Sequence, residues 1–353
     1  MTSSPTLAGL DLAALDSHLH SVGISRVGPL RAELITGGRS NLTFLVRDDT
    51  SSWVLRRPPL HGLTPSAHDM GREYRVVAAL AGTDVPVAAA VTMSDDDAVL
   101  GAPFQMVEFV PGLVVRRRAE LDALGGPEMI ESCVDGLIRV LVQIHSVDPQ
   151  VVGLGDFGRP TGYLDRQVRR WGSQWERVRL SGDVRDGDVQ RLYNLLAEHI
   201  PAHSRTTLVH GDYRIDNTVI DPDDATKVRA VLDWELSTLG DPLSDAAMMC
   251  VYRDPAMDLI NHGDAAWASP NMPSADALAQ SYAVHAGSAL PNWGFYLALA
   301  YFKLAIIAAG IDYRNRESGG RADSSDQVGQ SVAPLIASGL SALSHIRSDS
   351  RFG

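Results

Sequence analysis

The feature that most constrains this chain is the pattern of residues 206–234. A short apolar and β-branched run at 206–209 leads into a polar segment at 210–217. Two more apolar runs follow, at 218–220 and 228–232, with the turn sequence Asp-Pro-Asp-Asp between them. Short apolar runs bounded by turn residues are typical of strands. The stretch therefore predicts a buried strand, a polar loop and a β-hairpin, in that order.

Polar side chains frame this hairpin. Asn217 stands at its entrance, Asp233 at its exit, and Asp212 lies just upstream in the loop. Because a hairpin doubles back, we expect the three side chains to lie close together. Two carboxylates about 4 Å apart repel each other by roughly 4 kcal/mol at an effective dielectric constant near 20, so the group needs a cation. Mg²⁺ suits such oxygen ligands and is usually shared with the phosphates of a nucleotide. The free carboxylate can then accept a proton from an attacking hydroxyl.

The polar segment His210 to Asn217, HGDYRIDN, resembles the H-G-D-x-x-x-x-N motif of aminoglycoside phosphotransferases and choline kinases, relatives of the protein kinases. The resemblance implies that Asp212 is the catalytic base and that Asn217 and Asp233 hold the metal. It places Arg214 where protein kinases have a lysine that contacts the transferred phosphate, and it gives His210 a supporting role in the loop. The alternative is a polar loop between strands with no catalytic role.

The same resemblance implies an α+β, bilobal, protein-kinase-like fold. Residues 1–109 would form a nucleotide-binding lobe, and residues 110–353 a larger, mainly helical lobe for catalysis and substrate binding. The first lobe should contain a helix over 12–22, a helix from Ser66 to Gly82 with Asp69 in a capping box, and a five-stranded antiparallel sheet. Its strands are expected at 31–35, 42–47, 52–56, 87–91 and 104–109.

The nucleotide site follows from the same likeness. A Gly-Gly turn resembles the family's phosphate-covering loop, a strand cation is paired with a helix glutamate, and a hinge binds adenine. The implied residues are Gly37, Gly38, Ser40, Asn41, Arg56, Glu73, Met106, Glu108 and Val110. Arg56 departs from the family pattern, which has a lysine there, and no lysine occurs before the hinge. Arginine keeps the charge but is longer and planar. For Glu73, a solvated position on a helix surface is the alternative.

Beyond the hinge the pattern is helical. Apolar residues recur at helical spacing over 130–144, and a second helix runs from Tyr163 through Trp175. Tyr163, Arg166 and Trp171 resemble one branch of the family, the phosphotransferase-like domains associated with acyl-CoA dehydrogenases, which makes them candidate substrate residues. Core packing is an equal alternative for the tryptophans. A further helix begins at Asp241-Pro242, an N-cap followed by proline. On it, Asp245 is expected to brace the catalytic loop.

Composition limits the compartment and the partners. The chain has 353 residues with a formal net charge of −12, which argues against sequence-independent binding to nucleic acid. It has two cysteines and no stretch typical of a signal peptide, so a cytoplasmic location is expected. Residues 293–311 are nearly long and apolar enough to span a membrane, but Lys303 stands in their middle. We therefore expect a buried core helix and no membrane contact.

The sequence supports two hypotheses about function. The first is a small-molecule kinase that uses ATP and Mg²⁺ to phosphorylate a substrate hydroxyl, on a hydroxyacyl-CoA or an aminoglycoside-like alcohol. For a CoA thioester, arginines near the site are expected, and Arg166, Arg169 and Arg170 are candidates. The second is a nucleotide-binding partner of an acyl-CoA dehydrogenase without catalysis, suggested by Arg56 in place of lysine.

Overall fold

The structure is a computed structural model that describes residues 7–35, 41–60, 69–180, 182–202, 204–260, 263–317 and 326–349. The chain divides into two compact units. The sheet unit is Met1–Gly112 together with Arg229–Ser237, and the helical unit is Leu113–Val228 together with Thr238–Gly353. The expected division fell after residue 109, and it did not include the return of residues 229–237 to the first unit. The roles assigned to the two lobes stay predictions.

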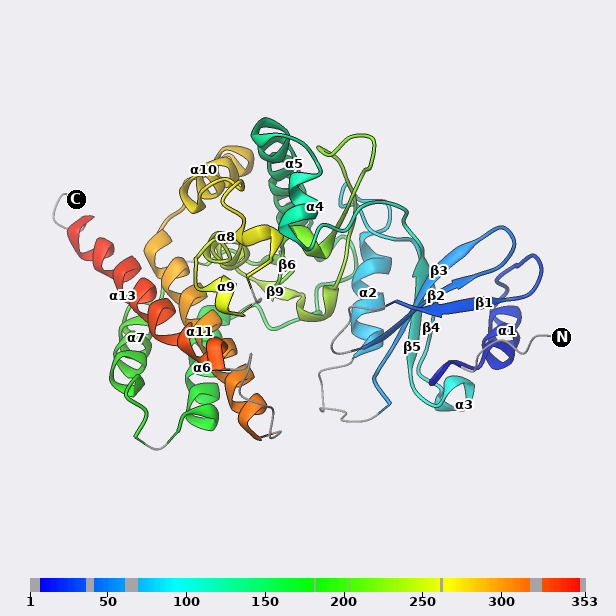
Figure 1. Cartoon of the computed structure of the whole chain (residues 1–353), viewed down its shortest axis with the longest axis horizontal. Coiled ribbons are helices and arrows are strands. Elements are labelled where there is room, and N and C mark those ends of the chain that lie inside the picture. The colour runs from blue at the N-terminus through cyan, green and yellow to red at the C-terminus, as the bar shows by residue number, and fades with distance from the viewer. Residues whose placement is uncertain are drawn as a thin grey trace. The chain divides into compact units, whose positions relative to one another are not determined.

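The sheet unit contains the predicted five-stranded antiparallel sheet, in the order β1-β2-β3-β5-β4 (Figure 1). The strands are β1 (Arg31–Leu34), β2 (Leu42–Arg47), β3 (Ser52–Arg57), β4 (Ala90–Ser94) and β5 (Phe104–Glu108). Three helices accompany them: α1 (Leu12–Ser21), α2 (Met70–Leu80) and α3 (Asp97–Leu100). The strand expected at 87–91 thus begins three residues later. The helix expected from Ser66, which lies outside the described residues, begins at Met70, because Asp69 is its N-cap and accepts a hydrogen bond from the Arg72 amide.

Strand β3 shows why the two faces of this sheet differ. Trp53, Leu55 and Arg57 are buried on one face, where α1 and α3 supply Leu15, Leu19 and Leu100 to the same core. Side chains alternate along a strand, so Arg56 points to the opposite face. Helix α2 contacts β4 and β5 and buries one stripe of its surface, Met70, Glu73, Val76, Val77 and Leu80, at helical spacing. Glu73 is therefore carried into the interior and is not the solvated charge of the alternative interpretation.

The helical unit is built around α11 (Trp293–Glu317). This helix contacts α6 (Tyr163–Val178), α7 (Asp186–Glu198), α8 (Pro242–Val251), α12 (Asp326–Gln330) and α13 (Val332–Asp349). Around them lie α4 (Arg118–Asp122), α5 (Pro127–Ser146), α9 (Met257–Ile260) and α10 (Ala275–Ala286). By length and composition α11 could cross a membrane, but 67% of its apolar window is buried inside the structure, as the core-helix interpretation expects.

Short strands carry the polar loop. β6 (Thr207–Val209) was predicted as a strand. It pairs with β9 (Thr238–Gly240), a strand that was not predicted. β7 (Thr218–Ile220) and β8 (Val228–Val231) form the predicted hairpin. Three short 3₁₀ turns complete the described elements: η1 (Ile215–Asn217), η2 (Trp234–Leu236) and η3 (Ala266–Ala268).

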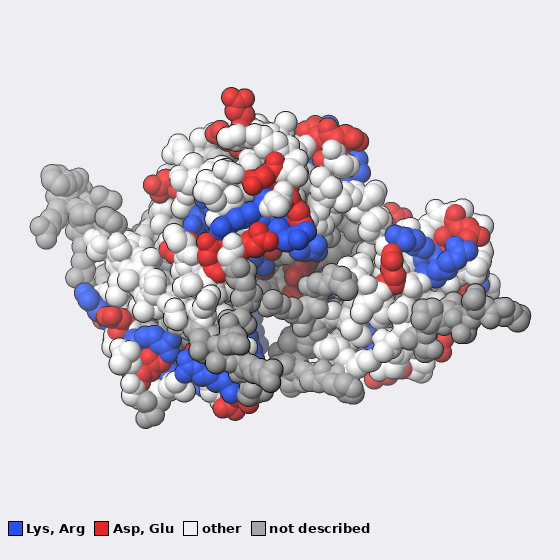
Figure 2. Space-filling view, viewed as in Figure 1, with Lys and Arg blue, Asp and Glu red and all other residues white. Residues whose placement is uncertain are grey.

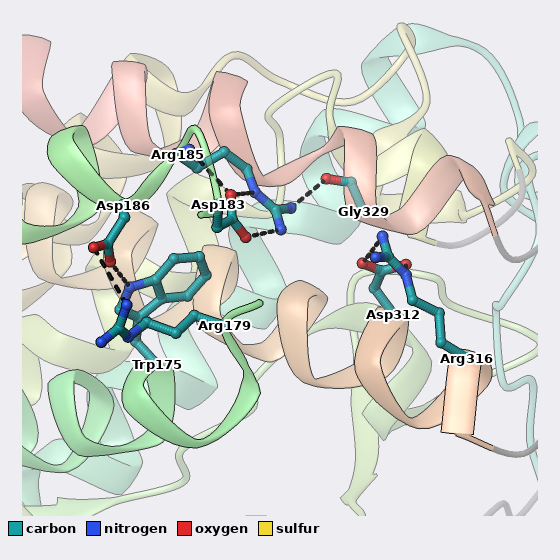
Figure 3. Close-up of polar contacts among 8 residues, drawn as sticks. All are labelled: Trp175, Arg179, Asp183, Arg185, Asp186, Asp312, Arg316 and Gly329. Carbon is teal, nitrogen blue, oxygen red and sulfur yellow. Dashed lines mark hydrogen bonds and ion pairs between the residues drawn. The ribbon is translucent and has the colours of Figure 1, made fainter. Parts of the chain in front are cut away.

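Hydrogen bonds and ion pairs connect α6, α7 and α12 of the helical unit (Figure 3). Asp186 accepts a hydrogen bond from Trp175 Nε1 at 2.8 Å, which joins α7 to α6. Arg185 pairs with Asp183 and donates to the Gly329 carbonyl of α12 at 3.2 Å. On the face in Figure 2, basic side chains of this kind lie beside acidic ones. The Arg185–Asp183 and Arg316–Asp312 ion pairs therefore neutralise these charges within the helical unit.

Candidate active site

Asp245 organises the polar loop that follows β6. Its carboxylate accepts hydrogen bonds from the backbone amides of His210, at 2.6 Å, and Gly211, at 2.9 Å. Burial alone would raise the pKa of Asp245, but the hydrogen bond and charge of His145, with further help from His210, outweigh it and lower the pKa. Asp245 is therefore an anion whose hydrogen bonds fix the backbone at the start of the loop.

Buried side chains hold Asp245 and the loop from behind. His145 Nε2 lies 3.4 Å from Asp245 Oδ2, and His145 Nδ1 lies 2.8 Å from the Tyr282 hydroxyl. Tyr213 is buried and donates its hydroxyl to the Leu137 carbonyl of α5 at 2.8 Å. The loop is thus fixed by three helices, α5, α8 and α10. A rigid backbone of this kind is what a catalytic side chain needs in order to keep its position.

Asp212 is surrounded by donors. Tyr252 donates its hydroxyl to Asp212 Oδ1, and Asn217 Nδ2 donates to Asp212 Oδ2 at 3.1 Å and to the Asp212 carbonyl at 2.8 Å. Arg214 Nε lies 3.4 Å from Asp212 Oδ1. Burial would raise the pKa of Asp212, but the Arg214 charge and the Tyr252 hydrogen bond outweigh it, so the pKa is lowered. The carboxylate is therefore ionised near neutral pH and can accept a proton.

Arg214 is held in place by its own neighbours. It pairs with Asp216, Nη2 to Oδ2 at 3.3 Å, and its guanidinium carbon lies 5.4 Å from the centre of the Tyr252 ring. Burial raises the pKa of Asp216, against the opposing charge of Arg214. The cation next to the candidate base is thus positioned by an aromatic face and a carboxylate. Its predicted contact with the transferred phosphate stays a prediction.

The amide of Asn217 is oriented by the contacts it makes. Within the part of the chain that the structure describes, both of its hydrogen bonds use Nδ2, so the carboxamide oxygen is left for another partner. An oxygen ligand next to a carboxylate suits Mg²⁺. Among the described residues, no group of three or more His, Cys, Asp or Glu side chains could hold a metal by itself. A metal held here would therefore complete its shell with ligands such as phosphate oxygens, and the donor set fits that mode.

The sheet unit contains a separate charged group around Arg56. The guanidinium donates to Glu73, lies 3.2 Å from Asp233 Oδ1, and lies 3.9 Å from Glu235 Oε2. Burial would lower the pKa of Arg56, but the charges of Glu73, Asp233 and Glu235 outweigh it and raise the pKa. One cation thus faces three carboxylates. In addition, Arg56 Nε is buried without a hydrogen-bond partner among the described residues, as a donor kept for a phosphate would be.

Asp233 has a strained backbone. Its φ is 61° and its ψ is 58°, the left-handed region that aspartate seldom occupies. Such conformations persist where the surroundings enforce them, and they cluster at functional sites. Asp233 belongs to the sheet unit, whereas Asp212 and Asn217 belong to the helical unit. The expected approach of the three side chains therefore stays a prediction.

The structure describes some, but not all, of the other residues predicted to bind the nucleotide. Gly37, Gly38 and Ser40 lie outside the described residues, whereas Asn41 is buried and its Nδ2 lies 3.5 Å from Glu235 Oε2. Met106 is fully buried in the core that also contains Phe44 and Phe104, so its position gives no support to contact with a nucleotide. The last strand residue, Glu108, is exposed, and Val110 is partly buried. Their assigned roles stay predictions.

The candidate substrate residues lie on α6. Tyr163 packs against Gly240, where an added Cβ would come within 2.7 Å of its ring. Arg166 donates to the carbonyls of Arg159 and Thr161, just before its own helix, and Arg169 pairs with Asp165. Two of the three arginines considered for a CoA thioester are therefore used locally. Trp171 lies in the helical unit with the guanidinium of Arg170 5.3 Å from its ring centre.

Three residues at these groups were missed from the sequence. Tyr252 stands at the C-terminal end of α8, and nothing in its local pattern indicates a bond to Asp212. Glu235 follows Asp233 by two residues, a spacing that could have drawn attention. Lys303 offered the clearest signal, since it is the single charge within the apolar stretch 293–311 and such a charge needs a partner. Its Nζ donates to the Gly211 carbonyl at 3.0 Å.

Comparison with known proteins shows the family of this chain. A family model described as "Phosphotransferase enzyme family" matches residues 31–278. Acyl-CoA dehydrogenase family member 10 of Mus musculus is 36% identical over 330 residues, which are 91% of this chain and 30% of that protein. The chain therefore spans less than a third of the length of this curated relative.

Solved structures give the same result. A Ralstonia eutropha protein, described provisionally as an aminoglycoside phosphotransferase, has a TM-score of 0.78 and 32% identity over 94% of this chain and 98% of its own. A thermostable mutant of aminoglycoside phosphotransferase APH(4)-Ia, in complex with AMP-PNP and hygromycin B, has a TM-score of 0.59 at 17% identity, covering 92% and 99% of the two chains. This second likeness shows the fold alone. The α+β, protein-kinase-like fold class and the predicted resemblance are confirmed, and the chain belongs to the phosphotransferase enzyme family.

Proposed function

We propose that this protein is a small-molecule kinase that uses ATP and Mg²⁺ to phosphorylate a substrate hydroxyl. The observation that carries the proposal is the environment of Asp212, a carboxylate kept ionised and oriented by Tyr252, Asn217 and Arg214. Such a group can accept the proton of an attacking hydroxyl. Membership of the phosphotransferase family and the AMP-PNP complex of a structural neighbour support the use of a nucleotide.

The proposed reaction assigns a role to residues described above. In the helical unit, Asp212 is the base and Arg214 supplies positive charge for the phosphoryl group. In the sheet unit, Arg56 donates to nucleotide phosphate, held in place by Glu73. Asn217 and Asp233 would hold Mg²⁺, which neutralises phosphate charge when it is bound. Positioning and charge neutralisation supply most of the rate in this chemistry.

Two classes of acceptor follow from the relatives. The likeness to a protein named for acyl-CoA dehydrogenase supports a hydroxyacyl-CoA as the acceptor and an acyl-CoA dehydrogenase as a partner. The hygromycin B complex of a structural neighbour supports an aminoglycoside. Because the first relative is much more similar in sequence, we place the hydroxyacyl-CoA first.

The experiment is an acceptor screen with the full chain. Incubation with Mg-ATP and a panel of hydroxyacyl-CoA thioesters and aminoglycosides should release ADP with at least one acceptor. Mass spectrometry should then find that acceptor phosphorylated. Asp212→Asn is the matched control and should bind the nucleotide with strongly reduced turnover. Binding of ATP with no phosphorylated product in the panel, or equal product from Asp212→Asn, would overturn the proposal.

A further inference from the structure

Lys303 is an unusual residue in its setting. It is one of only two lysines in the chain, and it lies between the buried residues Phe302 and Leu304 of α11. Taking an ammonium group out of water is unfavourable unless it is paired or hydrogen-bonded. A lysine at this position of a long apolar helix therefore needs a partner for its charge.

The backbone of Gly211 is one partner of that charge. Lys303 Nζ donates to the Gly211 carbonyl at 3.0 Å, while the Gly211 amide donates to Asp245 Oδ1 at 2.9 Å. Gly211 has a φ of +89°, a conformation that glycine adopts easily and other residues do not. The residue directly before Asp212 is therefore held by α8 on its amide side and by α11 on its carbonyl side.

Charged groups from three segments act on the ammonium. Asp212 of the loop and Asp245 of α8 favour its charged form, whereas Arg170 of α6 opposes it. The ring of Trp171, also on α6, has its centre 6.0 Å from Lys303 Nζ, within the range of a cation–π contact. Burial is the largest influence and lowers the pKa of Lys303, in spite of the two carboxylates. The carboxylates and the ammonium are thus electrostatically coupled.

We infer that Lys303 is a positioning residue for the proposed phosphoryl transfer, whose ammonium holds the backbone at Gly211 so that Asp212 is presented to the acceptor hydroxyl. This role rests on the proposed function, since it needs Asp212 to be the base. The ammonium does not act on the reacting atoms itself. It fixes the loop, so its removal should affect kcat and leave the KM for ATP nearly unchanged.

The first test needs no activity. Protein labelled with ¹³C at the lysine Cε should give two such resonances, from Lys303 and Lys227, and the Lys227→Met variant assigns them. The Lys303 resonance should titrate below the ordinary lysine pKa, and in Asp212→Asn it should titrate lower still, because one favourable negative charge is gone. Lys227, which pairs with Asp224 on the surface, should be unaffected by that variant. A Lys303 resonance that titrates as Lys227 does and ignores Asp212→Asn would overturn the inference.

The second test is kinetic. Lys303→Met keeps the apolar stem and loses the donor, so we expect kcat to fall by about 10- to 100-fold, the effect of a small misplacement of a catalytic group. Lys303→Arg should restore most of kcat, and it should retain activity at alkaline pH where the wild type loses it. Lys227→Met is the matched control and should keep the wild-type kcat. Full kcat in Lys303→Met would contradict the positioning role.

The two tests separate the two proposals. If no acceptor is phosphorylated by the wild type, the proposed function fails, while the coupling of Lys303 to Asp212 can still be seen by NMR. If the wild type is active and Lys303→Met is equally active, the inference fails alone. Should Lys303→Met not fold, Lys303→Arg and the titration of the wild-type protein decide the matter.

Discussion

Asp212 in the helical unit and Arg56 in the sheet unit are surrounded in opposite ways. Each acceptor oxygen of Asp212 has a donor from the protein, and Asp245 behind it has several. Around Arg56, a single guanidinium serves Glu73, Asp233 and Glu235. In the helical group the carboxylate oxygens of Asp212 and Asp245 are hydrogen-bonded by the protein, whereas in the sheet group one guanidinium faces three carboxylates.

This difference indicates which of the two charged groups depends on a bound ligand for its stability. A group that is fully hydrogen-bonded is pre-organised and gains little from a cation. A group with unbalanced carboxylates is stabilised by whatever positive charge binds there. We therefore expect the loop around Asp212 to keep its geometry in the free protein and the Arg56 group to respond to Mg²⁺ and nucleotide.

The largest expected effect comes from Asp212→Asn. Removing the proton acceptor while keeping the shape of the side chain should lower kcat by about 10²- to 10⁴-fold, the usual contribution of a general base. Nucleotide affinity, measured by calorimetric titration, should change little, because Arg56 and Asp233 lie in the other unit. If the variant bound ATP much more weakly, the separation of roles drawn above would be wrong.

Asp245→Asn should have the largest effect on stability. The variant offers one acceptor where the amides of His210 and Gly211 need two, so we expect a loss of about 3 kcal/mol in the free energy of unfolding. Denaturant titration followed by circular dichroism measures it. The partly exposed pair of Asp258 and Arg118 supplies the control, since Asp258→Asn should cost less than about 1 kcal/mol.

The same carboxylate gives a prediction for pH. The pKa of Asp245 is lowered in the folded protein, so its contribution is fully present above the unfolded-state pKa of about 3.9 and is lost as the pH falls through the folded value. The stability difference between wild type and Asp245→Asn should therefore stay constant near neutral pH and shrink in strongly acidic solution. Urea titrations over a pH series would show it. A difference that grew on acidification would have the wrong sign.

Arg56→Met tests the sheet group and should have a smaller effect. Without the guanidinium, three carboxylates face one another, two of them partly exposed, and we expect a loss of about 2 kcal/mol in stability. Added Mg²⁺ should raise the melting temperature of this variant more than that of the wild type, because the ion replaces the missing charge. Arg47→Met, which removes an exposed pair with Glu33 on β2 and β1, serves as the control. An equal shift of the melting temperature by Mg²⁺ in all three proteins would contradict the expected dependence of the Arg56 group on a bound cation.

Much of the fold could be predicted from the sequence, because its signals are local. Apolar runs and turn residues located the five strands of the sheet and the hairpin, and N-caps such as Asp241 marked where helices begin. Strand β4 was displaced because residues 87–91 are apolar enough for a strand but its pairing with β5 begins only at Ala90. The HGDYRIDN motif likewise named the loop residues correctly as neighbours, since they are contiguous in the chain.

Other features depended on contacts between distant segments. The sequence by itself determined which residue types stand in the loop, that Glu73 lies on a helix, and that a lysine interrupts the apolar stretch 293–311. Only the tertiary structure decided that Tyr252 bonds to Asp212, that Glu235 joins the Arg56 group, and that Lys303 reaches the Gly211 carbonyl. The physical reason is that hydrophobic periodicity and turn chemistry act over a few residues, whereas a charged side chain within an apolar helix finds its partner through packing that brings together residues 92 positions apart.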